Sequence, residues 1–585
     1  MNREWSLDIL YKDFKDEKYI NDFKRFEDLA SEMNTLSNSL ADKAKNEETL
    51  ILIIEKMEEF SLLITKLYSY AELRQATNTT DNDAVSQISA ILKLNSSVSK
   101  ANAMINKYIA SYDNLEEIIE KNAFLKEYEF FLKEIKENSK YLLSDDVEEV
   151  ISKLNLSAGA SWNNMQSFLT STLEVDYDGK IVTLPEIRNL AYNKDKNVRK
   201  AAYEAELKAY NKIKDAISFS LNNIKVQVNT ISELRGYESP LAMTLKLSKM
   251  KKETLNALLE AMKEYMPKFH LYLRRKAELL GYKNGLPWFE LFAPIGESDR
   301  KFTTEEARDY LLNHFSSFSQ DIADLMKEAF DNEWIDFYPK KGKVGGAFCA
   351  NMSFVKQSRV LTNFDGSLSD VVTLAHELGH AYHGKMIETH RPLNWEYSMP
   401  VAETASTFNE TVVMNAAIKE ASDKEKIALI ESQLQDTTQI ICDIYSRFLF
   451  ESAVFEKSKT EFLFADSLEQ MMLDAQKEAY GDGLDSEFLH PYMWVNKSHY
   501  YSEALSFYNF PYAFGGLFAR GLYEKYMEEG ETFLPKYQAL LKATTVSTVE
   551  DAAKEAGIDL ENPEFFRKSL QSFGKLIDEF LELTK

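Results

Sequence analysis

Apolar positions in residues 1–155 recur every three or four residues, with Lys and Glu between them, as in the segment 55–63. This spacing predicts a succession of amphipathic helices. Polar clusters at 78–81 and 144–146 predict breaks between those helices. The apolar positions keep no strict seven-residue repeat and the segments are short, which favours a helical bundle over a coiled-coil scaffold.

The period changes to two near residue 173. Apolar and polar residues alternate over 173–177, and Asp178-Gly179 separates this run from a second β-type run at 180–184. An Asp-Gly step between two such runs is typical of a β-hairpin. The sequence therefore predicts a hairpin at 173–184.

Helical periodicity then returns until about residue 335, apart from a loop at 281–296 that contains Gly and Pro. A second β-prone island lies at 345–365, and the remainder of the chain again has a helical pattern. We therefore expect a mainly α protein with small β elements. We place an amino-terminal helical lobe at 1–190, with the hairpin near its end, and a second domain at 191–585.

Charge and composition narrow the classes of function. Lys and Arg number 69 and Asp and Glu 93, which gives a net charge of −24 and no general affinity for nucleic acid or anionic lipid. The apolar run at 50–54 is far shorter than the ~20 residues of a membrane span. The only cysteines, Cys349 and Cys442, cannot form a disulfide framework. We expect a soluble cytoplasmic protein without a nucleic-acid or membrane partner.

Candidate chemistry is concentrated in the segment His376-Glu377-Leu378-Gly379-His380. Ser367 or Ser369 is a candidate cap for a helix that carries it. On a helix His376 and His380 face the same way, so both imidazoles can reach one metal ion, and Glu377 can contact a water there without being a ligand. Zinc lowers the pKa of such a water towards about 7, and the carboxylate takes its proton during peptide hydrolysis.

The alternative is a pair of surface histidines on an exposed helix. Apolar residues surround the two histidines and predict a buried helix: Val371, Val372, Leu374, Ala375 and Leu378. Buried imidazole and carboxylate groups need partners, and a metal supplies one.

A catalytic zinc has three protein ligands and one open position. Glu403 and Glu410 are seven residues apart, so they share a face if the segment is helical. Such pairs are common on solvated faces, but this segment is otherwise apolar or small. We interpret Glu403 as the third ligand and Glu410 as a hydrogen-bond partner of a ligand histidine.

The run 376–383, followed by Glu403-Thr404-Ala405-Ser406 and Glu410, resembles the thimet-type oligopeptidase family of zinc peptidases. Residues 345–349 and 363–367 resemble its oligoendopeptidase F branch. The resemblance covers most of the sequence. It implies a two-lobed helical body with a deep channel that admits peptides but not folded proteins.

The resemblance also implies residue roles. One zinc ion per chain would be held by His376, His380 and Glu403, with Glu377 as the general base. The family places a histidine and tyrosines from a late segment over the scissile carbonyl, where they would stabilise the oxyanion. Here we favour His499, Tyr508 and Tyr512, with Tyr501 in reserve. The alternative is that these aromatic residues belong to the core.

The expected strand at 346–349 has a possible role in substrate binding. An extended peptide can add to a strand edge through main-chain hydrogen bonds, which would involve Gly346, Ala347 and Phe348. The glycines at 345 and 346 would allow close backbone approach. An ordinary flexible turn is the competing interpretation.

The favoured function is a zinc-dependent endopeptidase that hydrolyses internal bonds of short, unstructured peptides. A zinc exopeptidase of similar fold is the runner-up, because the sequence shows no identifiable group for binding a peptide terminus. A non-catalytic zinc-containing scaffold is disfavoured: a structural zinc usually closes its fourth position with Cys or His, and Cys349 and Cys442 have no paired ligand spacing.

Overall fold

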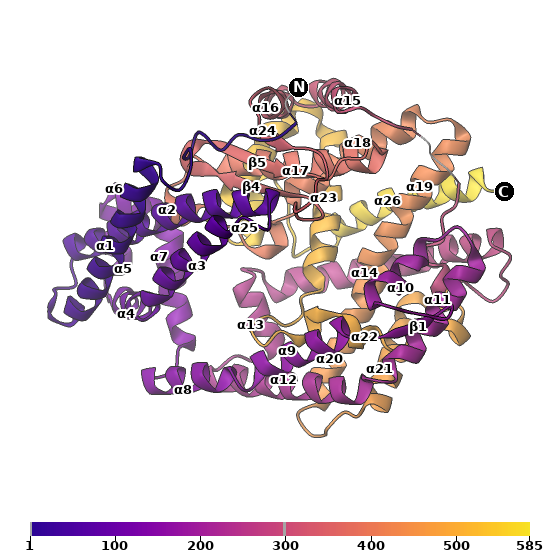
Figure 1. The fold of residues 1–585 in the computed structure, drawn as a ribbon, viewed down its shortest axis with the longest axis horizontal. Coiled ribbons are helices and arrows are strands. Elements are labelled where there is room, and N and C mark those ends of the chain that lie inside the picture. Colours follow the sequence, from indigo (N-terminus) through magenta and orange to yellow (C-terminus); the bar gives the residue numbers. More distant parts are fainter. Residues whose placement is uncertain (1–2, 297–299) are drawn as a thin grey trace. The chain divides into compact units, whose positions relative to one another are not determined.

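The computed structural model describes residues 3–296 and 300–585, and the chain is mainly helical, as predicted (Figure 1). It divides into two compact units, each assembled from separate segments. Unit 1 comprises Met1–Lys140, Asp299–Val413 and Glu529–Gly557, and unit 2 comprises Tyr141–Ser298, Met414–Glu528 and Ile558–Lys585. Both units thus collect residues from either side of position 190, and the predicted division into 1–190 and 191–585 stays a prediction.

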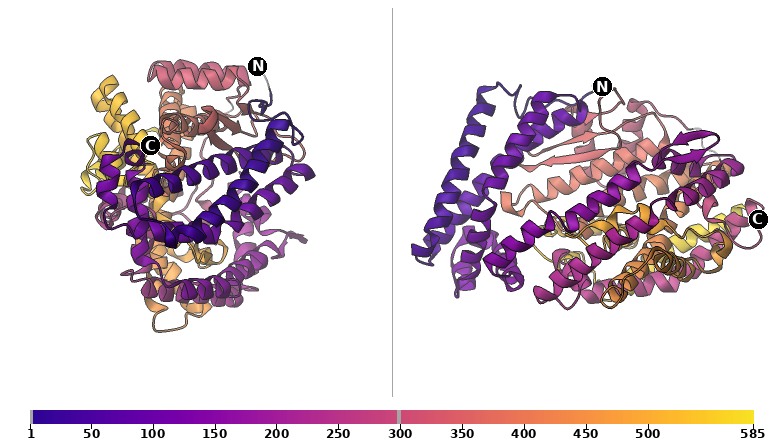
Figure 2. Two further views of the ribbon diagram at one scale, coloured as in Figure 1. Left: turned by 90° about the vertical axis from the view of Figure 1, so that its left-hand side faces the viewer. Right: turned by 60° about the horizontal axis from the view of Figure 1, so that its bottom comes forward.

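The first part of unit 1 is a helical bundle. Its helices are α1 (Glu17–Ser39), α2 (Glu47–Thr77), α3 (Asn82–Ser97), α4 (Ser99–Ala110), α5 (Leu115–Lys121), α6 (Ala123–Glu127) and α7 (Glu129–Asn138). The two longest, α1 and α2, lie side by side (Figure 2). Asp16, Asn46 and Asp81 cap the amino ends of α1, α2 and α3, since each side chain accepts a backbone N–H bond of the first turn. The break predicted at 78–81 is confirmed, whereas the one predicted at 144–146 lies slightly too late, because helix α8 (Asp145–Asn155) already begins at Asp145.

A three-stranded sheet follows in unit 1, in the order β3-β5-β4. Strand β3 (Ile335–Asp336) is parallel to β5 (Gln357–Leu361), and β4 (Phe348–Met352) is antiparallel to β5, with Cys349 opposite Val360. Strand β4 is therefore an edge strand. The predicted strand start at residue 346 is wrong by two residues: Gly346 has a φ of +77°, which is outside the β region, and pairing begins at Phe348.

The remaining helices of unit 1 precede or follow the strands of this sheet along the chain. They are α15 (Thr304–Ser316), α16 (Gln320–Asp331), α17 (Leu368–Ile387), α24 (Leu534–Ala543) and α25 (Val549–Glu555). Helix α18 (Thr404–Glu420) begins in unit 1. Helix α17 packs on β4 and β5, and its first residues are buried apolar side chains such as Leu368 and Val371.

Unit 2 contains the predicted hairpin. Strands β1 (Val175–Tyr177) and β2 (Lys180–Val182) are antiparallel, and the connecting Asp178 and Gly179 have φ values of +50° and +71°. Two consecutive positive φ angles are the requirement of a tight hairpin turn, which explains the Asp-Gly pair. The hairpin prediction is confirmed.

The helices of unit 2 are α8 (Asp145–Asn155), α9 (Gly159–Ser171), α10 (Leu184–Asn189), α11 (Lys196–Tyr210), α12 (Lys214–Leu234), α13 (Pro240–Leu247), α14 (Lys252–Leu279), α19 (Asp423–Thr438), α20 (Ile444–Lys457), α21 (Ala465–Tyr480), α22 (Met493–Asn496), α23 (Phe510–Glu529) and α26 (Glu564–Leu583). The long helices α14 and α26 pack together, with Tyr272 and Phe580 in an edge-to-face contact at 5.5 Å between ring centroids. Buried Lys276 forms an ion pair with Glu431 of α19. Among the described residues, no helix combines the length and the apolar character that a membrane crossing would demand.

Candidate metal centre and active site

Helix α17 carries the two histidines and Glu377. It begins at a capping box: the Ser367 Oγ accepts the Asp370 N–H at 3.1 Å, and Asp370 accepts the Ser367 N–H at 3.0 Å. The predicted cap at Ser367 is thereby confirmed. The rings of His376 and His380 lie one turn apart on this helix, with centroids separated by 4.9 Å.

Glu403 reaches the histidines from a different element. It directly precedes α18, and its carbonyl accepts the Thr407 N–H at 3.1 Å, which closes the first turn of that helix. Glu403 was expected within a helix and instead lies at its amino end, because the chain passes from a short 3₁₀ turn at 399–401 into α18 at this point.

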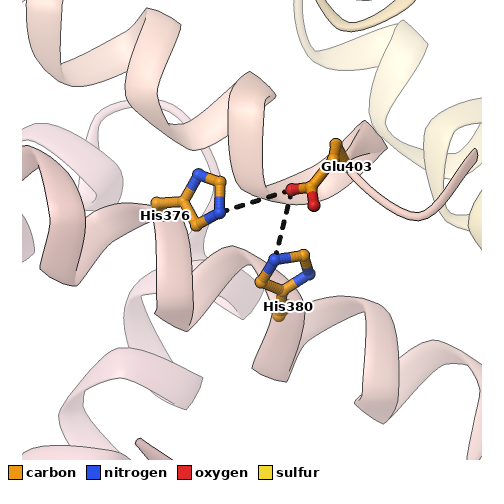
Figure 3. Close-up of side chains that lie close together, drawn as sticks. All are labelled: His376, His380 and Glu403. Atoms are coloured by element: carbon orange, nitrogen blue, oxygen red, sulfur yellow. Dashed lines mark ion pairs between the residues drawn. The ribbon is translucent and has the colours of Figure 1, made fainter. Parts of the chain in front are cut away.

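The three predicted ligands lie together (Figure 3). The Glu403 Oε2 is 3.3 Å from the His376 Nε2 and 3.3 Å from the His380 Nε2. The possible ligand atoms all lie within 4.8 Å of one another. Two imidazole nitrogens and one carboxylate oxygen form the kind of donor set that a catalytic zinc uses, with a fourth position left for water or substrate.

The electrostatics of this cluster favour a cation. Burial lowers the pKa of His376, but hydrogen bonds to Glu403 and Glu410 outweigh it and raise that pKa to about 10. Burial raises the pKa of Glu403, yet its contacts with His376 and His380 bring it well below the usual range. Positive charge is thus stabilised between these side chains, which is the condition that a metal ion also requires.

Two further contacts fix the ligands. The Glu410 Oε1 lies against the His376 Nδ1, and the Nε2 of the same ring faces Glu403. The Ser406 hydroxyl donates to the Glu403 Oε2 at 2.7 Å. Hydrogen bonds of this kind orient ligand side chains. The sequence pattern gave no role to Ser406, because its partner is set by the bend between the 3₁₀ turn and α18.

Close helix packing brings α17 and the start of α18 together. A Cβ added to Gly379 would lie 2.5 Å from the Ala405 carbonyl oxygen and 2.6 Å from the Ser406 Cα. Buried Asn409 donates from Nδ2 to the Ala375 carbonyl at 3.0 Å and ties the two helices. Gly379 therefore permits the close approach that places Glu403 beside both histidines. Sequence reasoning had assigned no role to Gly379 or to Asn409.

Glu377 directly follows His376 in the sequence and is 5% exposed. Its carboxylate interacts electrostatically with the side chains of the metal-ligand cluster. Burial raises its pKa, and the nearby His376 and His380 oppose that rise. A carboxylate whose pKa is raised is a stronger proton acceptor. The neighbouring Cys349 thiol has its pKa raised by burial and then by Glu377, so it stays protonated.

His383, one turn beyond His380, has a different role. Its Nε2 lies 2.8 Å from the Thr544 Oγ1, and its ring stacks on Tyr397 at 4.3 Å between centroids. Burial and then the nearby His380 lower its pKa to about 3. His383 is a neutral core histidine.

The late aromatic segment forms a second cluster, within unit 2. The His499 Nε2 lies 3.4 Å from the Tyr512 hydroxyl, and the rings of His499 and Tyr508 are 5.0 Å apart. Tyr512 is 40% exposed, whereas Tyr501 is fully buried and its hydroxyl donates to the Trp494 carbonyl at 2.9 Å. The reserve candidate Tyr501 is thus a core residue.

A strained turn positions Tyr508. Phe507 has a φ of +54°, which costs free energy for a side chain of its size. Glu451 holds the turn, since its Oε1 accepts the Phe507 N–H at 3.0 Å and its Oε2 accepts from the Asn509 Nδ2 at 2.9 Å. Lys225 neutralises this buried carboxylate at 2.7 Å. Lys225 and Glu451 thus hold the turn at 507–509, and sequence reasoning had not singled them out.

The predicted substrate-binding residues lie where β4 begins. Gly346 is exposed, and its carbonyl accepts from the Asn363 Nδ2 at 2.8 Å. Ala347 precedes the strand, and Phe348 is its first paired residue. The edge of β4 opposite β5 has no strand partner among the described residues.

The family of the chain follows from comparison with known proteins. The sequence model described as "Peptidase family M3" matches residues 189–572. The chain belongs to this family. A second model, "Oligopeptidase F", matches residues 110–174, so the resemblance to the oligoendopeptidase F branch is confirmed.

Relatives of this M3 chain have similar lengths. It is 25% identical over 591 residues to an oligopeptidase PepF from Bacillus subtilis strain 168, covering 99% of this chain and 87% of the relative. It is 25% identical over 613 residues to an oligoendopeptidase F homolog from Lactococcus lactis subsp. lactis strain IL1403, covering 99% and 97%. The family and these relatives indicate a metalloendopeptidase.

Solved structures show the same fold. A putative peptidase from Chlamydophila abortus superposes with a TM-score of 0.83 at 20% identity, covering 98% of both chains. The oligoendopeptidase-F from Enterococcus faecium superposes with a TM-score of 0.70 at 18% identity, covering 96% of this chain and 99% of the other.

Proposed function

We propose that this M3 peptidase is a zinc-dependent endopeptidase that hydrolyses internal bonds of short, unstructured peptides. The observation that carries the proposal is the convergence of His376, His380 and Glu403, with Glu377 on the same helix. One zinc ion per chain would be held by the two Nε2 atoms and the Glu403 carboxylate. When bound, zinc lowers the pKa of a water towards about 7 and polarises the scissile carbonyl.

Glu377 is the proposed general base. Its carboxylate accepts the proton of the attacking water and returns a proton to the leaving amine. The raised pKa of Glu377 supports the first step, because a more basic carboxylate takes up a proton more readily. Glu410 and Ser406 keep the ligand side chains in orientation throughout.

The late cluster is the proposed oxyanion site. A hydroxyl or imidazole N–H aimed at the carbonyl oxygen strengthens its hydrogen bond as negative charge develops there. Within unit 2, His499, Tyr508 and Tyr512 lie in mutual contact and supply such donors.

Peptide binding is proposed at the edge of β4 that has no strand partner among the described residues, and at the residues before it. An extended peptide that pairs with Phe348–Met352 would be held through its main chain, with Gly346 and Ala347 at the entrance. Such binding suits short unstructured substrates, because a folded protein has no free extended segment to offer. The substrate channel and the cytoplasmic location stay predictions.

The test combines metal analysis with peptide cleavage. Internally quenched peptides blocked at both ends should be cleaved by the holoenzyme, and a chelator should abolish cleavage until zinc is restored. Glu377→Gln should retain one zinc and lose hydrolysis by about 10²-fold or more. Glu388→Gln, at the carboxyl end of the same helix, is the matched control and should keep both.

Three results would count against the proposal. Cleavage only of peptides with a free terminus would establish the exopeptidase alternative. Full zinc content with no cleavage of any peptide would favour a scaffold. Efficient digestion of a stably folded protein would contradict the size limit.

A further inference from the structure

A cavity within unit 2 shares no residue with the metal centre or with the cluster of His499, Tyr508 and Tyr512. It encloses about 630 Å³ between α9, α10, α11, the turn at Trp288–Glu290 and the segment 490–497. This volume is within the range of small-molecule sites, about 300–1,000 Å³. With Gln439, residues from six stretches of the chain thus form one concave site.

The wall of the cavity is rich in aromatic side chains. Tyr192 and Phe292 lie 4.9 Å apart between ring centroids, and Tyr203 and Phe289 lie 5.5 Å apart. Trp288 adds a third aromatic surface. Such a wall offers contact area to an apolar or aromatic group.

The charges of the wall are unusual for so acidic a protein. Three basic residues, Arg188, Arg199 and Lys497, line the cavity with one acidic residue, Glu206. The Arg199 Nε donates to Glu290 at 2.9 Å, and the Arg188 Nε lies 3.3 Å from Glu206. Both arginines are therefore already neutralised.

Lys497 is the exception. It is half-buried in the wall, and within 3–296 and 300–585 no hydrogen bond or ion pair involves its amine. The nearest acidic groups are engaged elsewhere: Asp443 pairs with Arg447, and Glu206 with Arg188. Burial, followed by the charge of Arg447, lowers the pKa of Lys497 to about 8. A partly desolvated amine without an ion-pair partner gains an attractive charge when an anionic ligand enters the cavity.

We propose that this cavity binds a carboxylate that carries an apolar or aromatic group. Lys497 is the ion-pair partner of the carboxylate, and the aromatic wall contacts the apolar group. One uncompensated cation matches a single negative charge, which favours a carboxylate over a phosphate. Two sources share this chemistry: a free organic acid, and the carboxyl terminus of a peptide that ends in an apolar residue.

The experiment is calorimetric titration of the full chain with four probes. They are 3-phenylpropionate, its neutral amide, acetyl-Ala-Ala-Phe with a free carboxylate, and the amidated form of that peptide. Each acid should bind at least tenfold more tightly than its amide. Tight binding of 3-phenylpropionate alone identifies a free acid as the ligand, and much tighter binding of the peptide acid identifies a peptide terminus.

Variants assign the binding to Lys497. Lys497→Gln should weaken the acids at least tenfold and leave the amides unchanged. Lys208→Gln is the matched control, since Lys208 lies exposed on α11, one of the helices of the wall. Ala191→Phe keeps Lys497 but fills part of the cavity, and it should weaken both acid and amide. This second variant keeps the test decisive if Lys497→Gln does not fold.

A carboxylate can also bind a metal ion, so the titrations are repeated in His380→Ala. This variant lacks a proposed zinc ligand and should bind the acids as the unmodified chain does, without hydrolysing the peptide. Three results would overturn the proposal: equal affinity for acids and amides, unchanged affinity in both Lys497→Gln and Ala191→Phe, or loss of acid binding in His380→Ala. The proposed peptidase activity is not measured here, so its failure would leave this result intact.

Discussion

Glu410 contacts the Nδ1 of His376, the ring nitrogen on the side away from Glu403. When a metal displaces the proton from the Nε2, this contact would keep the remaining proton on the Nδ1. A carboxylate partner also makes the imidazole a stronger metal ligand.

Glu410→Gln should therefore lower zinc affinity by about 10- to 100-fold, because the amide holds the same position without the negative charge. Competition with a chromogenic chelator measures this affinity. Glu420→Gln, exposed at the end of the same helix, should leave it unchanged. Equal zinc affinity in both variants would separate Glu410 from the metal site.

Gly379→Ala should lower both the melting temperature and the zinc content. The new methyl group meets main-chain atoms of Ala405 and Ser406 that cannot move independently of Glu403. Overpacking of this kind costs about 1–3 kcal/mol. Gly345→Ala is the control, since nothing lies within 4 Å of the added Cβ. Thermal unfolding and metal analysis compare the two variants. Equal melting temperatures and equal zinc contents would mean that α17 and α18 can move apart without loss of stability or metal.

Tyr508→Phe, Tyr512→Phe and His499→Ala should each lower kcat far more than they raise KM. Loss of one oxyanion donor typically costs about 3 kcal/mol, or roughly a hundredfold in rate. Tyr501→Phe should instead lower only the stability, because that hydroxyl bonds the Trp494 carbonyl in the core. If none of the three variants loses kcat while remaining folded, this segment is not the oxyanion site.

Lys497 should make folding stability rise with pH in an alkaline window. Its pKa falls from an ordinary value of 10.5 to about 8 in the folded chain. Between these values the unfolded chain binds a proton that the folded chain lacks, so raising the pH favours the folded chain. Lys497→Met removes this titration, and its unfolding free energy should exceed that of the unmodified chain at pH 7 by more than at pH 10. Denaturant unfolding at both pH values measures the difference, and a constant offset would contradict the pKa.

Much of the fold could be predicted, because it follows from local rules. Asp178-Gly179 satisfies the backbone angles of a tight turn, and Ser367 with Asp370 satisfies the free N–H groups of a helix start. These features depend on residues a few positions apart. The grouping of His376 with His380 follows in the same way from helix periodicity.

The parts that were missed depend on contacts between distant segments. Strand β3 has only two residues, too few to show an alternating pattern, and it exists because β5 supplies a parallel partner. The contact of Gly379 with Ala405 joins two helices that are distant in the sequence. From the sequence alone, Gly379 could be recognised only as one position within a helix. The unpaired Lys497 is visible only once the partners of every nearby acid are known.

The edge position of β4 has a consequence for how the enzyme would choose among peptides. Main-chain N–H and C=O groups recur at the same interval in every extended peptide, whatever its side chains. Five residues of β4 can therefore accept many different sequences in the same alignment. In a mixed pool of peptides, the time that each peptide survives would then depend on its length and on how readily its main chain becomes extended. The chemical character of its side chains would matter little. Proline-rich members would survive longest, since proline lacks the N–H that such pairing needs.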